Sequence, residues 1–256
     1  FSRKHVFSLT AIGSAVFIVF GLMGNITDGY KIRLSNAALK IESSANDVNV
    51  SNLDILGDTL KIGGAILGDS HARAIAHSLN DALLDEKFGL KSYIKDGCPP
   101  LRGLYRHDMA SYGDDCDLHY KRAYGEIISD NSLQTVVISA RFTLYLESSR
   151  FDNGEGGIEI GATTNVIYDD VEFKNEIRSL PKRQALIAAR ITEDVKTLLD
   201  AGKKVVLIYP IPEVGWDAPR IGQNKAWKSG QDVNISTSFK QFITRNKYFF
   251  TQTNIA

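Results

Sequence analysis

The stretch AILGDSHA at residues 65–72 decides the fold class of this chain. Its first four residues are a short apolar run that ends in glycine, which is typical of a buried strand in a parallel sheet. Apolar side chains then recur every three or four positions, which predicts the buried face of a helix: Ala72, Ile75, Ala76, Leu79 and Leu83. A strand that leads directly into a helix is the repeating unit of α/β domains.

The same alternation continues along the rest of the chain. We predict strands at residues 90–94 (LKSYI), 135–140 (TVVISA) and 205–209 (VVLIY), and helices near residues 120–128 and 186–199, with Gly202 ending the last helix. This order predicts a doubly wound α/β domain with a mostly parallel sheet. In such sheets ligands bind beyond the carboxyl ends of the strands, so the chemistry is expected there.

A membrane helix is predicted before the globular part. Residues 6–23 (VFSLTAIGSAVFIVFGLM) carry no charge, and as a helix they would span about 27 Å. Arg3 and Lys4 precede them, so the N-terminus is expected in the cytoplasm and the rest of the chain outside it. A cleaved signal peptide has the same polarity, but no A-x-A pattern follows, which favours a retained helix. We expect a transmembrane helix at residues 1–24, a periplasmic extension at 25–62 with a strand or short helix in 49–62, and the α/β domain at 63–256.

Charge and cysteine content exclude several classes of protein. The 256 residues include 30 basic and 30 acidic ones, and this zero net charge argues against a nucleic-acid partner. The two cysteines rule out a four-thiolate zinc site. Cys98 and Cys116 lie 18 residues apart, and export favours a disulfide between them over free thiols. A metal site with His107 or His119 is disfavoured because the spacing matches no common zinc pattern, so we predict no metal.

The turn at residues 68–71 is a candidate catalytic site. Gly68 permits a sharp turn that exposes Ser70, and the first N–H groups of the following helix point to where an oxyanion would form. Ser70 or Asp69 could instead be an ordinary helix N-cap, which is the commoner role of such residues. The residue types alone leave both alternatives open.

Four segments in order resemble one family. GDSHA (68–72), GCPPL (97–101), VVISARFTLYLE (136–147) and IYPIPEVGWDAP (208–219) are similar to the SGNH, or GDSL-like, hydrolase domain. More narrowly, they resemble the version fused to the C-terminus of acyltransferase-3 membrane proteins, which O-acetylate bacterial surface polysaccharides such as lipopolysaccharide O-antigen. The resemblance covers nearly the whole chain and implies a three-layer, flavodoxin-like fold that follows the last transmembrane helix of such a fusion.

The resemblance also implies roles for individual residues. Ser70 matches the nucleophile, and its own N–H and that of Gly97 match two oxyanion donors. Asp69 and His71 belong to the same motif, where His71 is expected to orient the turn. The third donor, an Asn in a Gly-x-Asn motif, is missing, because this chain reads SARF at residues 139–142. Arg141 is presented there instead, either to bind substrate or to pair with a carboxylate.

The catalytic base departs from the family pattern. SGNH domains take acid and base from a C-terminal Asp-x-x-His, but this chain has five histidines, none of them after His119, and no Asp-x-x-His. The chain also begins with Phe1 rather than Met. We therefore expect a fragment of a longer protein, with acid and base beyond Ala256. A substitute base at His107 or His119 is the less favoured alternative.

The resemblance implies transfer of an acyl group, most simply acetyl, to a polysaccharide hydroxyl. No cofactor is expected in this domain, because an acetyl-CoA-derived donor would serve the acyltransferase-3 membrane part, in the bacterial inner membrane with the SGNH domain in the periplasm. The rival interpretations are a carbohydrate esterase and a non-catalytic glycan-binding module. Aromatic side chains could stack on sugars, although packing is the commoner role for any one of them: Tyr105, Tyr145, Trp216 and Trp227. The glycine-rich loop at residues 154–158 could lie near the mouth of the site.

Overall fold

The structure, a computed structural model, describes residues 2–46, 54–106, 115–159, 168–170 and 179–253. The chain divides into two compact units. One contains residues 1–47 and 217–235, and the other contains residues 48–216 and 236–256. The segment 217–235, which the sequence analysis places in the α/β domain, thus groups with the N-terminal residues. The expected division at residues 24 and 62 rests on the sequence and stays a prediction.

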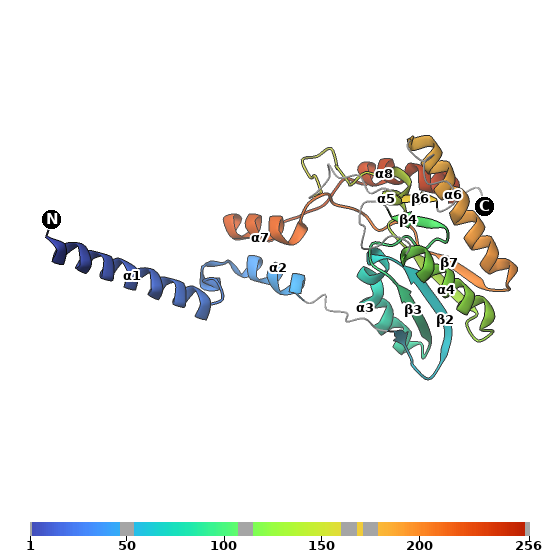
Figure 1. The fold of residues 1–256 in the computed structure, drawn as a ribbon, viewed down its shortest axis with the longest axis horizontal. Coiled ribbons are helices and arrows are strands. Elements are labelled where there is room, and N and C mark those ends of the chain that lie inside the picture. Colours follow the sequence, from blue (N-terminus) through green and yellow to red (C-terminus); the bar gives the residue numbers. More distant parts are fainter. Residues whose placement is uncertain (1, 47–53, 107–114, 160–167, 171–178, 254–256) are drawn as a thin grey trace. The chain divides into compact units, whose positions relative to one another are not determined.

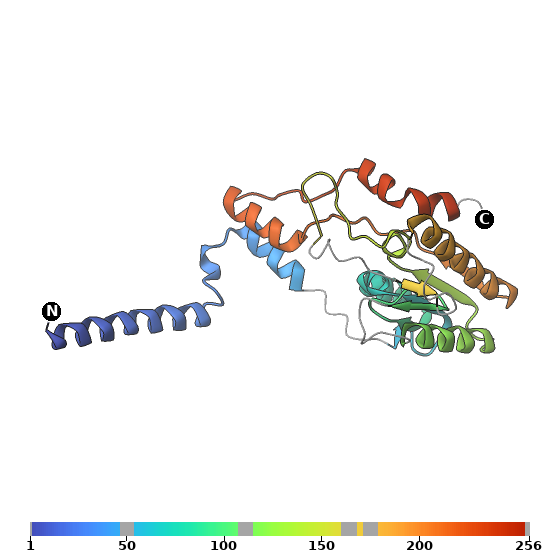
Figure 2. The ribbon, with the colours of Figure 1, turned by 45° about the horizontal axis from the view of Figure 1, so that its top comes forward.

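The first unit is helical. Helix α1 (Arg3–Ile26) has a mean hydropathy of 2.2 over 18 residues and is long enough to cross a membrane, as an anchor or as a signal sequence. A short 3₁₀ helix, η1 (Lys31–Arg33), follows it. Helix α2 (Asn36–Asn46) then packs beside α7 (Ala218–Ser229), as Figures 1 and 2 show. Trp227 of α7 also contacts η1, because its Nε1 donates to the carbonyl of Arg33 at 3.1 Å.

The second unit is built on a five-stranded sheet of order β1-β3-β2-β5-β7. Strands β3 (Gly89–Ile94), β2 (Ile62–Gly68), β5 (Thr135–Ser139) and β7 (Lys204–Leu207) are parallel to their neighbours. Strand β1 (Ile55–Gly57) is antiparallel to β3, so of the two alternatives expected in residues 49–62, a strand or a short helix, the structure has the strand. The predicted α/β class and mostly parallel sheet are confirmed.

Helices cover both faces of this sheet and make three layers (Figure 1). Alternate residues of β2 point to opposite faces, so Ala65 and Leu67 join one core cluster and Ile66 joins the other. Helix α3 (Ser70–Asp85) packs in the cluster of Ile66. Helices α4 (Asp115–Ser129) and α6 (Leu180–Asp200) pack in the larger cluster. Both faces are buried because parallel strands with apolar runs need cover on each side.

Three further elements complete the unit. Helix α5 (Phe142–Glu147) directly follows β5, and α8 (Phe239–Thr253) packs against α5 and α6. Phe142 and Phe249 stack with ring centroids 5.0 Å apart, which joins α5 to α8. A two-stranded antiparallel sheet pairs β4 (Leu104–Arg106) with β6 (Tyr168–Asp170). Helix α8 had no counterpart among the elements expected from the sequence.

Candidate active site

The turn after β2 requires a glycine because three elements meet there. A Cβ added at Gly68 would collide with the carbonyl oxygen of Ser139 in β5 and with the Cβ of Ala72 in α3. The Gly68 carbonyl accepts a hydrogen bond from the buried Tyr120 hydroxyl at 2.7 Å. The absence of a side chain thus lets the chain pass from the central strand into α3 in close contact with β5.

Asp69 holds this turn together. It is the N-cap of α3, and its carboxylate accepts from the N–H of His71 at 2.8 Å. The second carboxylate oxygen accepts from the N–H of Arg141 at 3.0 Å and from the hydroxyl of Tyr145. Asp69 is only 1% exposed, so these three donors replace the water that a carboxylate otherwise needs. Tyr145 is itself buried, so its role here is packing and hydrogen bonding rather than sugar stacking.

Ser70 is the exposed first residue of α3. The N–H groups of His71 and Arg73 are bonded to Asp69, whereas that of Ser70 has no hydrogen-bond partner within the described residues. Among those residues, no histidine is hydrogen-bonded to the Ser70 side chain either. Ser70 therefore combines an accessible hydroxyl with an N–H that is available to an oxygen anion.

Gly97 and Arg141 lie on the loops that flank this turn. Gly97 follows β3 with a φ of +72°, a left-handed conformation that favours glycine. Its loop is tied to α3 by an ion pair between Arg73 and Asp96 at 2.8 Å. Because β3, β2 and β5 are adjacent and parallel, these three loops meet at one edge of the sheet. The proposed roles of Ser70 and Gly97 in catalysis stay predictions.

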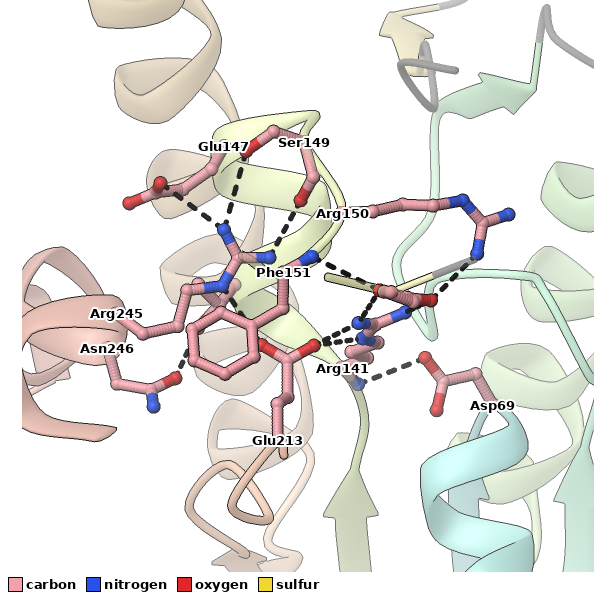
Figure 3. A network of polar contacts seen from close by, with 11 residues as sticks. Asp69, Arg141, Glu147, Ser149, Arg150, Phe151, Glu213, Arg245 and Asn246 are labelled. Atoms are coloured by element: carbon pink, nitrogen blue, oxygen red, sulfur yellow. Dashed lines mark hydrogen bonds and ion pairs between the residues drawn. The ribbon is translucent and has the colours of Figure 1, made fainter. Parts of the chain in front are cut away.

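The Arg141 side chain belongs to an ion-pair network, drawn in Figure 3. Its guanidinium donates to both oxygens of Glu159, at 3.0 and 2.6 Å, and also to Glu213. Arg245 donates to the other oxygen of Glu213 at 2.9 Å, and Arg150 donates to Glu159 at 2.7 Å. Of the two alternatives for Arg141, pairing with carboxylates is the one that this structure shows. The backbone N–H of Arg141 donates to Asp69, so it is not available to a substrate either.

The network sets the ionisation of its members. Although burial opposes it, the hydrogen bonds and charge of Arg141 lower the pKa of Glu159 to about 2. Burial likewise opposes the charged form of Arg141, but Glu159 and Glu213 raise its pKa above the ordinary value. Glu147 differs, because burial raises its pKa and Arg245 only partly offsets this. Glu159 and Arg141 are therefore ionised throughout the physiological range.

A cavity of about 320 Å³ lies beside this network. His71 and Ala74 of α3 line it, together with Arg141, Phe151, Glu159 and residues 211–216. Burial lowers the pKa of His71, so its imidazole is neutral at pH 7. Its Nδ1 is buried without a hydrogen-bond partner among the described residues. The glycine-rich loop expected near the site contributes to this wall through its flanking residues Phe151 and Glu159.

The remaining predicted residues lie away from the cavity or outside the described part of the chain. Cys98 and Cys116 form the expected disulfide, with Cα atoms 5.3 Å apart. His119 Nε2 lies 3.3 Å from the carbonyl oxygen of Tyr93, and His107 falls outside the described residues. Within the described ranges no three His, Cys, Asp or Glu side chains form a group that could hold a metal ion. The side chain of Tyr105 is likewise not described.

Sequence reasoning missed the partners of Arg141. Glu213 lies in the PEVG segment that was quoted for its resemblance, and Glu159 follows the glycine-rich loop, but neither was chosen as a functional residue. The available signal was the need of a half-buried guanidinium for carboxylates. Among more than twenty acidic residues outside the site, that need alone does not select these two.

Comparison with known families identifies most of the chain. Residues 43–254 match the model of a family described as the SGNH domain that is fused to AT3 domains. No AT3 domain is detected in this chain. No curated protein matches the chain significantly.

Proposed function

The chain belongs to the family of SGNH domains fused to AT3 domains, and we propose that it transfers an acyl group to a bacterial surface polysaccharide through Ser70. Membership in this family indicates an enzyme that performs acyl transfer or ester hydrolysis on carbohydrates. Transfer of acetyl to a hydroxyl of a glycan such as lipopolysaccharide O-antigen is the specific reaction that we propose.

The observation that carries this proposal is the exposure of Ser70 at the N-terminus of α3, next to the end of the central strand. An exposed hydroxyl can reach a carbonyl carbon, and the Ser70 N–H then lies on the same residue as the attacking oxygen. The helix dipole adds positive potential at this end of α3, which favours a negatively charged oxygen. An ordinary N-cap serine would instead have its oxygen occupied by the helix backbone.

The proposed reaction has two steps. The Ser70 oxygen attacks the acyl carbonyl of the donor and gives its proton to a base, and the donor's leaving group departs with a proton, which leaves an ester on Ser70. A sugar hydroxyl then attacks this ester, transfers its proton through the same base, and releases free Ser70 with an O-acyl sugar. The base is not assigned to any residue of this chain, because no imidazole is bonded to Ser70 among the described residues.

The proposed partners follow from the same family. Helix α1 would anchor the domain to the inner membrane, and an AT3 domain would supply acyl groups from an acetyl-CoA-derived donor. The disulfide between Cys98 and Cys116 supports a periplasmic location for the second unit, since such bonds persist in oxidising compartments. The acceptor would be the polysaccharide itself.

Two other functions are distinguished by experiment. Solvent exposure of Ser70 favours an esterase, in which water attacks the acyl-serine instead of a sugar. The absence of an imidazole bonded to Ser70, among the residues described, favours a glycan-binding module without catalysis.

The test uses the protein in its native membrane, incubated with an acetyl donor and the glycan. We expect acetylated glycan with unsubstituted Ser70, none with Ser70→Ala, and unchanged yield with Ser78→Ala, which alters another exposed serine of α3. Release of free acetate without acetylated glycan would establish the esterase instead. Equal acetylation by Ser70→Ala would remove Ser70 from the mechanism.

A further inference from the structure

The cavity beside Ser70 has the size of a site for one small ring. Its volume is about 320 Å³, and sites for small molecules begin at about 300 Å³. It is bordered by α3, by the loop after β5 and by residues 211–216. Ser70 itself does not line it, but His71, the next residue of α3, does. A ligand in this cavity would therefore contact the residue that follows the proposed nucleophile, and an extended oligosaccharide with one ring inside could continue toward Ser70.

The charged residues of the lining, Arg141, Glu159 and Glu213, belong to a network of ion pairs that extends beyond the cavity. Three guanidinium groups, on Arg141, Arg150 and Arg245, face three carboxylates, on Glu147, Glu159 and Glu213. Figure 3 shows the labelled members of this network converging from α5, the loop after it, α8 and the segment after β7. An anionic ligand would have to displace a carboxylate from these pairs. The network therefore favours an uncharged ligand.

Trp216 gives the cavity a flat apolar wall. The indole of Trp216 packs on Gly157, where an added Cβ would lie 2.6 Å from its Cε2 atom. The ring is thus held against backbone at a position that any side chain would disturb. A rigid indole of this kind offers a large apolar face to a ligand with its own apolar face.

His71 adds a polar group without a partner. Its Nδ1 is buried and unbonded among the described residues, and a buried polar atom in that state destabilises the structure. A neutral imidazole has one donor and one acceptor nitrogen, and a hydroxyl group can complement either. Because His71 lines the cavity, a polyol there could hydrogen-bond the imidazole, and would reach the buried Nδ1 if the ring turned toward the cavity; a purely apolar ligand could do neither.

We propose that this cavity is the acceptor subsite, and that it holds one uncharged sugar ring against Trp216 with a ring hydroxyl bonded to His71. This inference rests on the proposed function, since it assigns the cavity to the sugar that receives the acyl group. The C–H face of a pyranose is apolar while its rim carries hydroxyls, which matches an indole wall beside a lone polar atom. Trp216 would be a specificity-determining residue, and acidic sugars would be excluded by the balanced network.

The test exploits the fact that the chain has two tryptophans, Trp216 in the cavity and Trp227 in the other unit. Each is replaced in turn by Phe in the Ser70→Ala chain, purified in detergent, so that binding is measured without turnover. The probes are the methyl glycosides of glucose, galactose, mannose and rhamnose, and glucuronic acid as the charged comparison. Binding is followed by fluorescence and by saturation-transfer NMR.

We expect at least one neutral glycoside to change the Trp216 emission of Trp227→Phe in a saturable way, with glucuronic acid about tenfold weaker. In Trp216→Phe, NMR should show binding weakened about tenfold or more, and Trp227 should not respond. Gly157→Ala, which displaces the indole and keeps its chemistry, should weaken binding in the same direction, with an unfolding transition to verify folding.

Failure of all four glycosides to bind, equal binding by Trp216→Phe, or equal binding of glucuronic acid would each overturn the inference. Because these measurements use Ser70→Ala, they do not depend on acyl transfer. Acetylation of glycan by the protein with Ser70 intact, together with failed binding here, would overturn the subsite and leave the proposed function standing. Binding here without any acetylation would overturn the proposed function and leave the cavity as a sugar-binding site only.

Discussion

The turn after β2 and the loop after β5 lie at the same edge of the sheet, but their functional side chains differ in exposure and in hydrogen bonding. In the turn after β2, Asp69 collects backbone N–H groups and leaves the adjacent Ser70 exposed. In the loop after β5, the Arg141 guanidinium is bonded to Glu159 and Glu213. The first loop presents a group that is free to react, and the second supplies a rigid wall. The difference teaches that in this site the charged residues hold the structure together, whereas the uncharged Ser70 is the residue for which we propose a chemical role.

The largest effect that would test this comparison is the loss of Arg141. In Arg141→Met two carboxylates lose a partner, so we expect the free energy of unfolding to fall by about 3–5 kcal/mol. Urea denaturation measures it. Arg122→Met is the control, because that side chain is 82% exposed where it pairs with Glu126, and its removal should change stability by less than about 1 kcal/mol. Similar losses in both variants would show that Arg141 is not scaffold.

Removing the Asp69 carboxylate should come next in size. Asp69→Ala leaves two backbone N–H groups and the Tyr145 hydroxyl without their acceptor in a buried place. Each buried donor left unsatisfied costs about 1–3 kcal/mol, so at the lower end of that range the three donors give a loss of about 3 kcal/mol in thermal or urea unfolding. Asp85→Ala, at the exposed end of the same helix, should stay within about 0.5 kcal/mol. A stable Asp69→Ala protein would contradict the structural role assigned to this carboxylate.

Low pH should weaken the ion pairs of the loop after β5, because it protonates Glu159. Its pKa of about 2 lies below the ordinary value of 4.5, so its stabilising effect is complete above pH 4.5 and disappears as the pH falls through about 2. We expect the free energy of unfolding of the unsubstituted chain to fall more steeply over this window than that of Glu159→Gln. Unfolding curves at several pH values measure the difference, in which the similar contribution of Glu126 cancels. Parallel curves would show that Glu159 is not held ionised by Arg141.

The smallest effect should come from Ser70 itself. Because its side chain is exposed, we expect Ser70→Ala to change the free energy of unfolding by less than about 0.5 kcal/mol while it abolishes acyl transfer. The two measurements together sharpen the contrast with Arg141→Met. A loss above about 1 kcal/mol would mean that the Ser70 side chain stabilises the start of α3.

Much of the fold could be predicted because its signals are local. The apolar runs at β2, β5 and β7 and the three-four spacing in α3, α4 and α6 each lie within one short segment, and each predicted an element that the structure contains. Helices α2, α7 and α8 were not predicted, since the sequence assigned no element to their residues. The pairing of α2 with α7 joins residues as far apart as Glu42 and Gln223, 181 positions along the chain, which no local pattern encodes.

The sequence by itself determined the mostly parallel α/β sheet, the apolar N-terminal helix and the position of Ser70 after the central strand, because each depends on residues close together in the chain. It also determined which cysteines can pair, because the chain has only two. Only the tertiary structure decided that Arg141 pairs with Glu159 and Glu213, that Tyr145 serves Asp69, and that Trp216 lines the cavity beside His71. Those contacts join loops that follow different strands. The partners in these contacts are distant in the sequence and come close to one another only in the folded chain, so no local sequence pattern identifies them.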